Sequence, residues 1–342
     1  MSVQVQYTIP GWQPTQLTER IAPETTPFRT QMEGVAAPPL GSVPILLSLN
    51  QPPPGDLHLD PPPRPAGLPN PPPAVERWQR RDRIASHALF MGWFALDLGG
   101  LTPILWSFIE RDESVEMLAA LTGQRMLFNY FRIGGVNGDL NHEFMSRLGD
   151  WMSRAVSQIE SNISLLNENE IFVRRASGLG VVDTETALRY CMTGSNLRAT
   201  GVPFDLRRTH PYSIYNELEF DIPTRTEGDC LARYLLRMEE IKQSIRIIDQ
   251  CLEKMPDGPI MAKLPRLIRP RPGRAWSAVE GPRGVYGAYA ISDGTDQPFR
   301  LKIHDPSFIH LQAVGALLPG HLLADTMTIM ASLDPVMGGV DK

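Results

Sequence analysis

Residues 80–99 read RRDRIASHALFMGWFALDLG, and this stretch decides the fold. Its second half places apolar residues on nearly every side of a helix. A helix that is apolar all round belongs in the interior of a protein rather than on its surface. We therefore predict a buried helix here.

A series of helices is predicted to follow. Thr102 is a plausible N-cap for the next one, with Pro103 in its first turn and Gly123 as its stop. Residues 142–169 and 227–255 repeat apolar residues at helical spacing, which predicts two long amphipathic helices. The stripe of the first comprises Phe144, Leu148, Trp151, Met152, Ala155, Ile159, Ile163 and Leu166. A short helix over 184–194, ending at Gly194, is predicted between them.

The β content is predicted to be small. Residues 125–139 form a loop with short strand character, and 196–223 are loop-like. Two β-rich runs at about 284–304 flank Ser-Asp-Gly-Thr-Asp, a signal for a hairpin. A basic, proline-rich link precedes it at 263–274, and two helices at 306–316 and 319–331 follow. The fold class is mainly α with a small β element (α+β).

The first 75 residues differ in composition from the rest. Proline is crowded there, as in QPPPGDLHLDPPPRPAGLPNPPP at 51–73. Proline lacks an N–H and fixes φ, so such a run cannot form a packed helix or a central strand. We predict a mostly irregular or disordered segment over 1–75, with a docked arm as the alternative. The helical domain then covers 76–342.

Composition excludes several function classes. The net charge of −5 argues against nucleic-acid binding, which requires a basic face. No apolar run reaches the ~18 residues that span a bilayer. Cys191, Cys230 and Cys251 match no metal-binding spacing and are predicted to be small buried hydrophobes.

Four positions attract attention as candidate site residues. His87 follows Ser86 in the buried helix, and a hydrogen-bonded core histidine is the favoured interpretation. Asp97 lies in FALDLGG, either as a helix cap or buried structural pair, or as a site carboxylate. Arg132 precedes two glycines and either binds an anion or ties the loop to a helix. The charge run of Glu110 to Glu113, which includes Arg111, is predicted to be a solvated face or a local ion pair. These patterns alone form no catalytic constellation.

Ordered motifs from about Arg83 onward carry a family resemblance. RIASHALFMGWFALDLGGLTP, TGQRMLFNYFRIGGV, TGSNLRATGVPFDLRRTHPYSIY, EGDCLARYLLRMEEIKQSIRII and SLDPVMGGVDK resemble segments of one family, in its order. That family is the D subunit of bacterial NADH:quinone oxidoreductase (respiratory complex I), the 49-kilodalton subunit in mitochondria.

The resemblance implies a fold, because this family is similar to the large subunit of nickel–iron hydrogenases. We therefore expect a hydrogenase-like helical core. In those enzymes a C-terminal Asp-Pro-Cys-x-x-Cys supplies two metal thiolates, whereas Val336 and Gly339 stand at these positions here. Neither offers a soft ligand, so we expect no metal in this chain. An active hydrogenase would instead predict bound nickel. Asp334 is expected to anchor the chain end to an internal arginine.

The resemblance also implies a function. The family sits in the peripheral arm of the complex, at the cytoplasmic side of the bacterial inner membrane, with the B, C, H and I subunits as partners. Together with B and H it shapes a quinone cavity beside the terminal iron–sulfur cluster, which B carries. NAD(H) and the clusters belong to other subunits. Asp97 matches an aspartate that hydrogen-bonds a quinone-contacting histidine, and His87 is the second catalytic candidate. Arg111 and Arg132 match positions near the cluster-facing side.

Departures from the family leave an alternative open. The GPQHPxxHG loop and the later tyrosine that hold the quinone head group have no counterpart in 1–75. Ile109 and His304 replace common arginines, Val285-Tyr286 interrupts the usual RGELG, and the loop before Ala278 is short. The chain is therefore either a D subunit with a divergent N-terminus or a non-catalytic structural or assembly relative.

Overall fold

A computed structural model describes residues 74–125, 130–132, 135–136, 138–140, 142–212, 214–253 and 269–340. Most of the predicted irregular segment 1–75 and the first part of the 263–274 link lie outside these residues. The predicted irregular segment includes Ala74 and Val75, but these two residues already belong to a helix. The proline run ends at residue 73, and the residues directly after it include no further proline that would break a helix.

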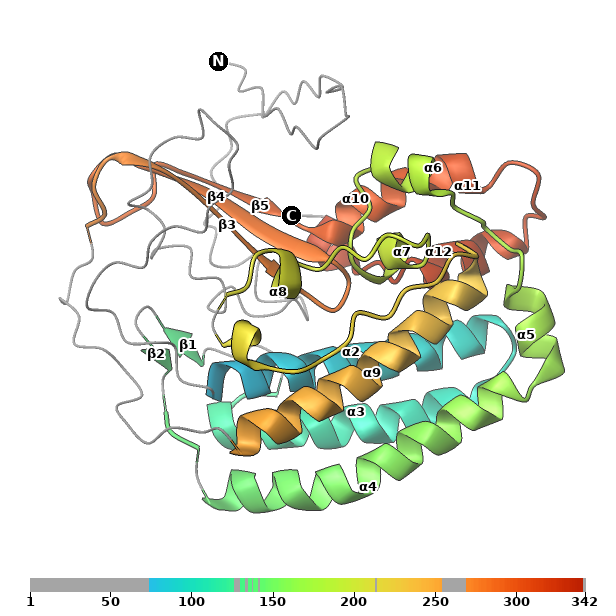
Figure 1. The fold of residues 1–342 in the computed structure, drawn as a ribbon, viewed down its shortest axis with the longest axis horizontal. Coiled ribbons are helices and arrows are strands. Elements are labelled where there is room, and N and C mark those ends of the chain that lie inside the picture. Colours follow the sequence, from blue (N-terminus) through green and yellow to red (C-terminus); the bar gives the residue numbers. More distant parts are fainter. Residues whose placement is uncertain are drawn as a thin grey trace.

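Four long helices form one layer of the molecule (Figure 1). They are α2 (Ala74–Asp97), α3 (Leu101–Thr122), α4 (His142–Asn167) and α9 (Cys230–Glu253). The prediction that α2 is buried is confirmed, because it packs against both α3 and α9. The centroid of its Phe94 ring lies 5.6 Å from that of Phe172 and 6.1 Å from that of Tyr234. Aromatic packing of this kind adds to the gain from burying the rings.

Helix α3 has a glycine at the capping position of each end. Gly100, rather than the predicted Thr102, occupies the N-cap position, and no side chain caps the helix there. The predicted stop at Gly123 is confirmed: its φ of 79° is left-handed, and its N–H donates to the Ala119 carbonyl. Glycine adopts this conformation without steric cost. The apolar stripe predicted for α4 faces the core, with Trp151 among its buried members.

Short helices connect the long ones. These are α5 (Glu170–Ala176), α6 (Thr184–Arg189), α7 (Gly194–Arg198), α8 (Leu206–Thr209) and the 3-10 turn η2 (Tyr215–Glu217). The predicted helix over 184–194 therefore ends five residues early. Cys191, with a φ of 51°, breaks it, and Gly194 begins α7 instead of ending α6. The 196–223 stretch was predicted to be loop-like, but it holds the second half of α7 and all of α8 and η2.

A three-stranded antiparallel sheet lies beside the helices, in the order β3-β4-β5. Its strands are β3 (Gly273–Glu280), β4 (Val285–Ser292) and β5 (Arg300–His304). The predicted hairpin is confirmed as β4 and β5, with Gly287 opposite His304. Strand β3 was not predicted, because the basic, proline-rich sequence before it resembles a linker. The strand character predicted for the earlier loop is confirmed by β1 (Phe131–Arg132) and β2 (Gly135–Val136).

The C-terminal region adds α10 (Pro306–Gln312), α11 (Val314–Leu317), α12 (Asp325–Ser332) and α13 (Met337–Val340). Two helices were predicted here, but the first divides at Ala313 and the second begins only at Asp325. Gly320, with a φ of 88°, prevents the earlier start. One hydrophobic core runs from Ile84 on α2 to Leu333 after α12. The class is thus α+β as predicted, and none of the described helices has the length and apolarity to cross a membrane.

Candidate functional site

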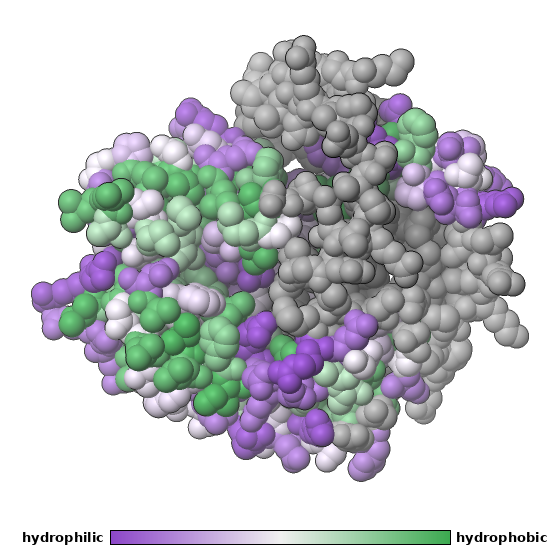
Figure 2. All heavy atoms as spheres, turned by 180° about the vertical axis from the view of Figure 1, so that it is seen from behind, coloured by the Kyte–Doolittle hydropathy of each residue, from purple (hydrophilic) through white to green (hydrophobic). Residues whose placement is uncertain are grey.

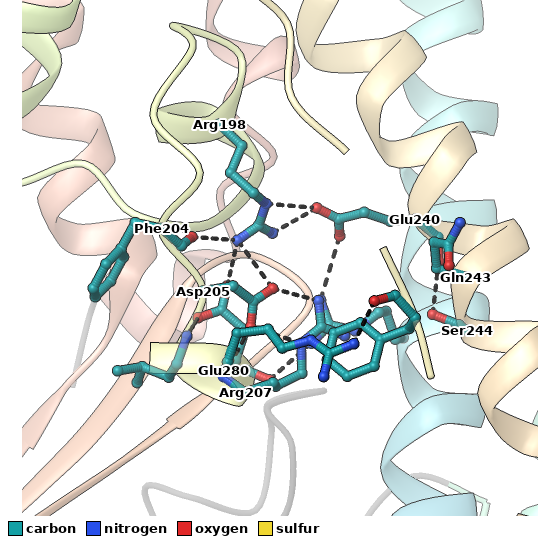
Figure 3. A network of polar contacts seen from close by, with 12 residues as sticks. Arg198, Phe204, Asp205, Arg207, Glu240, Gln243, Ser244 and Glu280 are labelled. Carbon is teal, nitrogen blue, oxygen red and sulfur yellow. Dashed lines mark hydrogen bonds and ion pairs between the residues drawn. The ribbon is translucent and has the colours of Figure 1, made fainter. Parts of the chain in front are cut away.

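A network of buried charged side chains joins the long helices to the sheet (Figure 3). Its members come from α2, α7, the α7–α8 segment, α8, α9 and the end of β3. All of them are buried: Arg83, His87, Arg198, Asp205, Arg207, Glu240 and Glu280. Charged groups tolerate burial only when they are paired and hydrogen-bonded. The geometry of each pair therefore decides what the network can do.

Arg198 lies at the centre of this network. Its Nη2 is 2.5 Å from Oε1 of Glu240, and its Nη1 is 2.9 Å from Oε1 of Glu280. It also donates to the Phe204 carbonyl at 3.0 Å. Burial alone would raise the pKa of Glu240, but Arg198, His87 and Arg83 hold it well below the ordinary value. Glu240 is therefore ionised, and one guanidinium ties α9 to β3.

Asp205 and Arg207 form the second strong pair. Arg207 donates from Nε to Oδ1 at 2.8 Å and from Nη2 to Oδ2 at 2.5 Å. Burial would raise the pKa of Asp205, but this fork of donors lowers it instead. Burial and the negative charge of Asp205 raise the pKa of Glu280. Together with Arg83 and Arg198, Arg207 brings the guanidinium groups of the network to three. They face three carboxyl groups, those of Asp205, Glu240 and Glu280.

His87 is one of the predicted site residues, and it belongs to this network. Its Nε2 lies 3.0 Å from Oε2 of Glu240. Burial lowers the pKa of His87, against the opposing pull of Glu240, so the ring is neutral. Because an ionised Glu240 can only accept, Nε2 carries the proton. Nδ1 is then an acceptor, and it has no hydrogen-bond partner among the described residues.

Asp97 lies apart from His87, at the C-terminal end of α2. It is partly exposed, and it makes no hydrogen bond or ion pair with any residue that the structure describes. Burial raises its pKa. A carboxylate at a helix C-terminus is also opposed by the helix dipole. Neither structural alternative, a cap or a buried pair, is therefore seen in the described part of the chain.

The remaining predicted residues lie on α3 and β1. Arg111 is partly exposed on α3. Arg132 lies in β1, and its side chain is outside the described part of the structure. The structure thus brings His87 together with Arg83 and Glu240, but it does not join His87, Asp97 and Arg111 into one cluster.

Glu110 corrects one prediction. The charge run that contains it was expected to be a solvated face or local ion pair, and its neighbours do form surface pairs, Asp112 with Arg125 and Glu113 with Arg154. Glu110 itself is buried, because it continues the stripe of Ser107 and Ser114 on the inner side of α3. Burial, with some contribution from Glu113, raises its pKa to about 7.

The chain end is anchored by Asp334, as predicted. Nε of Arg283 lies 3.3 Å from Oδ1 of Asp334 and donates to its carbonyl at 3.1 Å. Asp334 has a φ of 55°, a left-handed conformation that non-glycine residues rarely adopt. Ser307 adds a contact, because its hydroxyl accepts from the Val336 N–H at 3.2 Å.

Gly339 is one of the two positions that the resemblance predicts to correspond to a hydrogenase cysteine. A Cβ atom at Gly339 would lie 2.3 Å from Oδ2 of Asp305. A cysteine therefore has no room there unless Asp305 moves. The described residues contain no group of three or more His, Cys, Asp or Glu side chains that could hold a metal ion.

Helical spacing could have revealed buried polar residues of α9 that the sequence analysis missed, among them Glu240 of the network. On α9, Arg233, Arg237, Glu240 and Ser244 follow each other at intervals of four, three and four, and all are buried. This is the spacing of a stripe that faces inward. Arg237 stacks 4.1 Å from the Phe90 ring centre and donates to the Ser332 carbonyl at 2.9 Å. The contact between Arg198 and Glu280, in contrast, joins residues 82 positions apart in the sequence and leaves no such signal.

Comparisons with known proteins identify relatives of the chain. The profile of a family described as "Respiratory-chain NADH dehydrogenase, 49 Kd subunit" matches residues 97–274 and 267–342. The D subunit of NADH-quinone oxidoreductase from Carboxydothermus hydrogenoformans is 45% identical over 259 residues, which are 76% of this chain and 71% of that protein. The same subunit from Clostridium beijerinckii is 43% identical over 260 residues, 76% of this chain and 70% of that protein.

Proposed function

The chain belongs to the family of NADH-quinone oxidoreductase D subunits, and on that basis we propose that it works as one subunit of a complete NADH:quinone oxidoreductase (respiratory complex I). Quinone is then the substrate of the complex. NAD(H) and the iron–sulfur clusters are carried by other subunits, and this chain alone has no turnover.

A more specific proposal concerns the place of the chain in the complex. It forms part of the quinone cavity, beside the terminal cluster held by the B subunit, with C, H and I as further neighbours. The complex lies at the cytoplasmic side of the bacterial inner membrane. Residues 76–342 act as one hydrogenase-like helical domain, and 1–75 as a separate segment. The continuous core from Ile84 to Leu333 supports the single domain.

The proposal that the chain lines a quinone cavity rests on the environment of the Asp97 carboxyl group. It is a partly buried carboxyl group with a raised pKa, and no described residue pairs with it. A carboxyl group in such a setting can hold a proton or orient a donor near a reacting molecule. In this proposal Asp97 serves the quinone site.

The other predicted residues have supporting roles in the same proposal. His87 offers Nδ1 as a proton acceptor from within the network, because Glu240 keeps the proton on Nε2. Arg111 and Arg132 supply positive charge on the cluster-facing side. Positive charge favours the electron-rich forms of a quinone over the neutral one.

The test begins with assembly. The tagged chain is co-expressed with the B, C, H and I subunits of a related complex, and co-purification of B and C is measured. Absence of both from the purified chain would reject membership of the complex. Asp97→Asn should then lower inhibitor-sensitive NADH:quinone turnover at least tenfold with assembly intact. Asp112→Asn, which removes a surface carboxylate of the next helix, is the control and should keep turnover near that of the unmodified complex.

A second candidate function is supported by the extent of the match. The family profile begins only at residue 97, and the relatives align with 76% of the chain. The histidine loop that holds the quinone head group in the family is not found in 1–75. A non-catalytic structural or assembly relative would join the complex normally but would leave it without quinone turnover. Turnover of the assembled complex therefore separates the two.

A further inference from the structure

The three-stranded sheet β3-β4-β5 has two chemically different faces. Residues directly opposite each other in antiparallel strands point to the same side of a sheet, and the side alternates along each strand. The row Ala275–Ala290–Leu301 places the small apolar cluster of the sheet on one side. We name the opposite side the outer face. Its basic and aromatic members are Arg274, Trp276, Tyr289, Arg300, Lys302 and His304.

Trp276 lies at the middle of the outer face. Its indole covers Gly287 of the neighbouring strand, because a Cβ atom added to Gly287 would lie 2.3 Å from Cη2 of Trp276. The indole meets the His304 ring edge to face, with centroids 6.2 Å apart. Tyr289 is directly opposite Trp276, and both side chains are partly exposed. The centre of the outer face is therefore an accessible aromatic surface.

Cations flank this aromatic surface. Arg274 and Arg300 lie on either side of Ile291, and Lys302 lies opposite Tyr289. All three cationic side chains are exposed, and among the described residues no carboxylate pairs with either arginine. Hydrophilic residues are prominent at the upper right of Figure 2, the end of the molecule that carries the sheet in Figure 1. An occupant of the outer face should therefore combine negative charge with groups that pack on aromatic rings.

The proline-rich segment 51–73 of the same chain has this chemistry. Asp56 and Asp60 lie between the first two of its proline triplets, which are at 52–54, 61–63 and 71–73. Proline-rich segments bind aromatic-lined surfaces at a low entropic cost, because their extended conformation is formed in advance. Carboxylates form strong hydrogen bonds with guanidinium and ammonium groups. We propose that residues 51–73 dock on the outer face, with prolines against the two aromatic rings and the aspartates beside the cations.

The chain is long enough for this contact. Nη2 of Arg83 donates to the carbonyl of Glu280, the last residue of β3, at 2.8 Å. Helix α2 begins at Ala74, about 14 Å before Arg83 along its axis. Trp276 lies about 13 Å from Glu280 along β3. Residues 64–73 would span about 31 Å as polyproline II, which brings the second proline triplet within reach of the outer face. The inference goes beyond the proposed function and does not rest on it.

Site-specific photo-crosslinking in the full-length chain tests the inference. The photoreactive residue p-benzoylphenylalanine replaces Leu59, which lies between Asp56 and Asp60, and the crosslinked peptides are identified by mass spectrometry. We expect the crosslinks to fall within residues 273–304. The same probe in place of Ile171, which is 67% exposed on α5, is the control and should give no crosslink to these strands.

Variants of the outer face test the two parts of the contact. Arg274→Glu combined with Arg300→Glu should lower the crosslink yield from residue 59 at least fivefold, because both cations become repulsive to the aspartates. Arg174→Glu, on an exposed surface of α5, is the charge control and should leave the yield unchanged. Trp276→Ala should also lower the yield at least fivefold, whereas Trp276→Phe keeps a ring and should retain most of it. An unchanged yield in the double variant or in Trp276→Ala overturns the inference.

Other occupants give different crosslinks. The experiment is repeated with a mixture of nitrogen-15-labelled and unlabelled chains. Crosslinked peptides that combine the two labels would show that the segment docks on a second copy of the chain, which overturns the inference. Crosslinks only to helices outside the sheet, or no crosslink at all, would mean that another surface or solvent faces the segment, and either result overturns the inference as well.

Discussion

Arg198 and Glu240 form the ion pair on which the buried network depends, with 2.5 Å between Nη2 of the arginine and Oε1 of the carboxylate. Both side chains are buried, with at most 1% of their surface exposed to solvent. Arg198 also reaches Glu280 on β3, so one residue at the end of α7 links a long helix to the sheet. Loss of a single partner in such a network leaves a charge buried without compensation.

The first prediction concerns this pair. Arg198→Met keeps an apolar stem but removes the guanidinium, so Glu240 and Glu280 lose their shared partner. We expect the free energy of unfolding to fall by about 3–5 kcal/mol, measured by urea denaturation. Arg189→Met is the control, because Arg189 pairs with Glu185 on an exposed surface and its loss should cost less than about 1 kcal/mol. Equal effects of the two variants would contradict the central role of Arg198.

The second prediction concerns pH and Glu110. Its pKa is raised to about 7 in the folded chain, against 4.5 for the free side chain. The folded state therefore holds this proton more tightly than the unfolded state does, and stability is lost as pH rises from about 4.5 through about 7. Thermal melting of the unmodified chain at several pH values should show this loss.

Glu110→Gln should remove this part of the pH dependence, because the amide has no proton to lose in this range. Its melting temperature should exceed that of the unmodified chain above pH 7 and approach it at low pH. Glu113→Gln is the control on the same helix, since Glu113 faces Arg154 at the surface. If the Glu110→Gln chain keeps the full pH dependence, another group causes it.

The contrast between Glu110 and its neighbours also shows what the sequence could and could not predict. Apolar periodicity predicted the long helices, because it reports directly on which side of a helix faces the core. It did not predict the burial of Glu110, although the 4-3-4 spacing of Ser107, Glu110 and Ser114 with Pro103 carries the same information in polar residues. A charge run indicates solvent by default, and tertiary packing overrode that default here.

Contacts between residues that are distant in the sequence were also not predicted. The anchor of Asp334 to an arginine was predicted from the resemblance, but Arg283 as the partner depends on a contact across 51 residues. Strand β3 was missed because its strand character appears only when it pairs with β4, from Glu280 opposite Val285 to Gly273 opposite Ser292. Pairing between distant segments has no local signature, so pattern analysis of one sequence cannot find it.

The third prediction separates charge from backbone conformation at Asp334. Asp334→Ala removes the carboxylate that pairs with Arg283 and also places alanine at a φ of 55°, which alanine tolerates poorly. Asp334→Asn removes only the charge, since asparagine adopts this conformation more readily. Both should lower the midpoint of urea unfolding, with the larger drop for alanine, and neither should change the metal content. A loss of bound metal in either variant would contradict a purely structural role.

The last prediction tests whether there is room for a side chain at residue 339. Gly339→Ala would bring a Cβ atom to 2.3 Å from Oδ2 of Asp305, a buried side chain that caps α10 through the Ser307 N–H. Asp305 would have to move and weaken that cap, so we expect a loss of about 1–3 kcal/mol in the free energy of unfolding. Gly149→Ala is the matched control, because a Cβ atom on that exposed turn of α4 meets nothing within 4 Å. Alanine there should stabilise the helix by up to about 1 kcal/mol. If Gly339→Ala lowers the free energy of unfolding while Gly149→Ala raises it, packing against Asp305 leaves no room for a side chain at residue 339. If both substitutions raise the free energy of unfolding, the position has room for a side chain and could accept a cysteine.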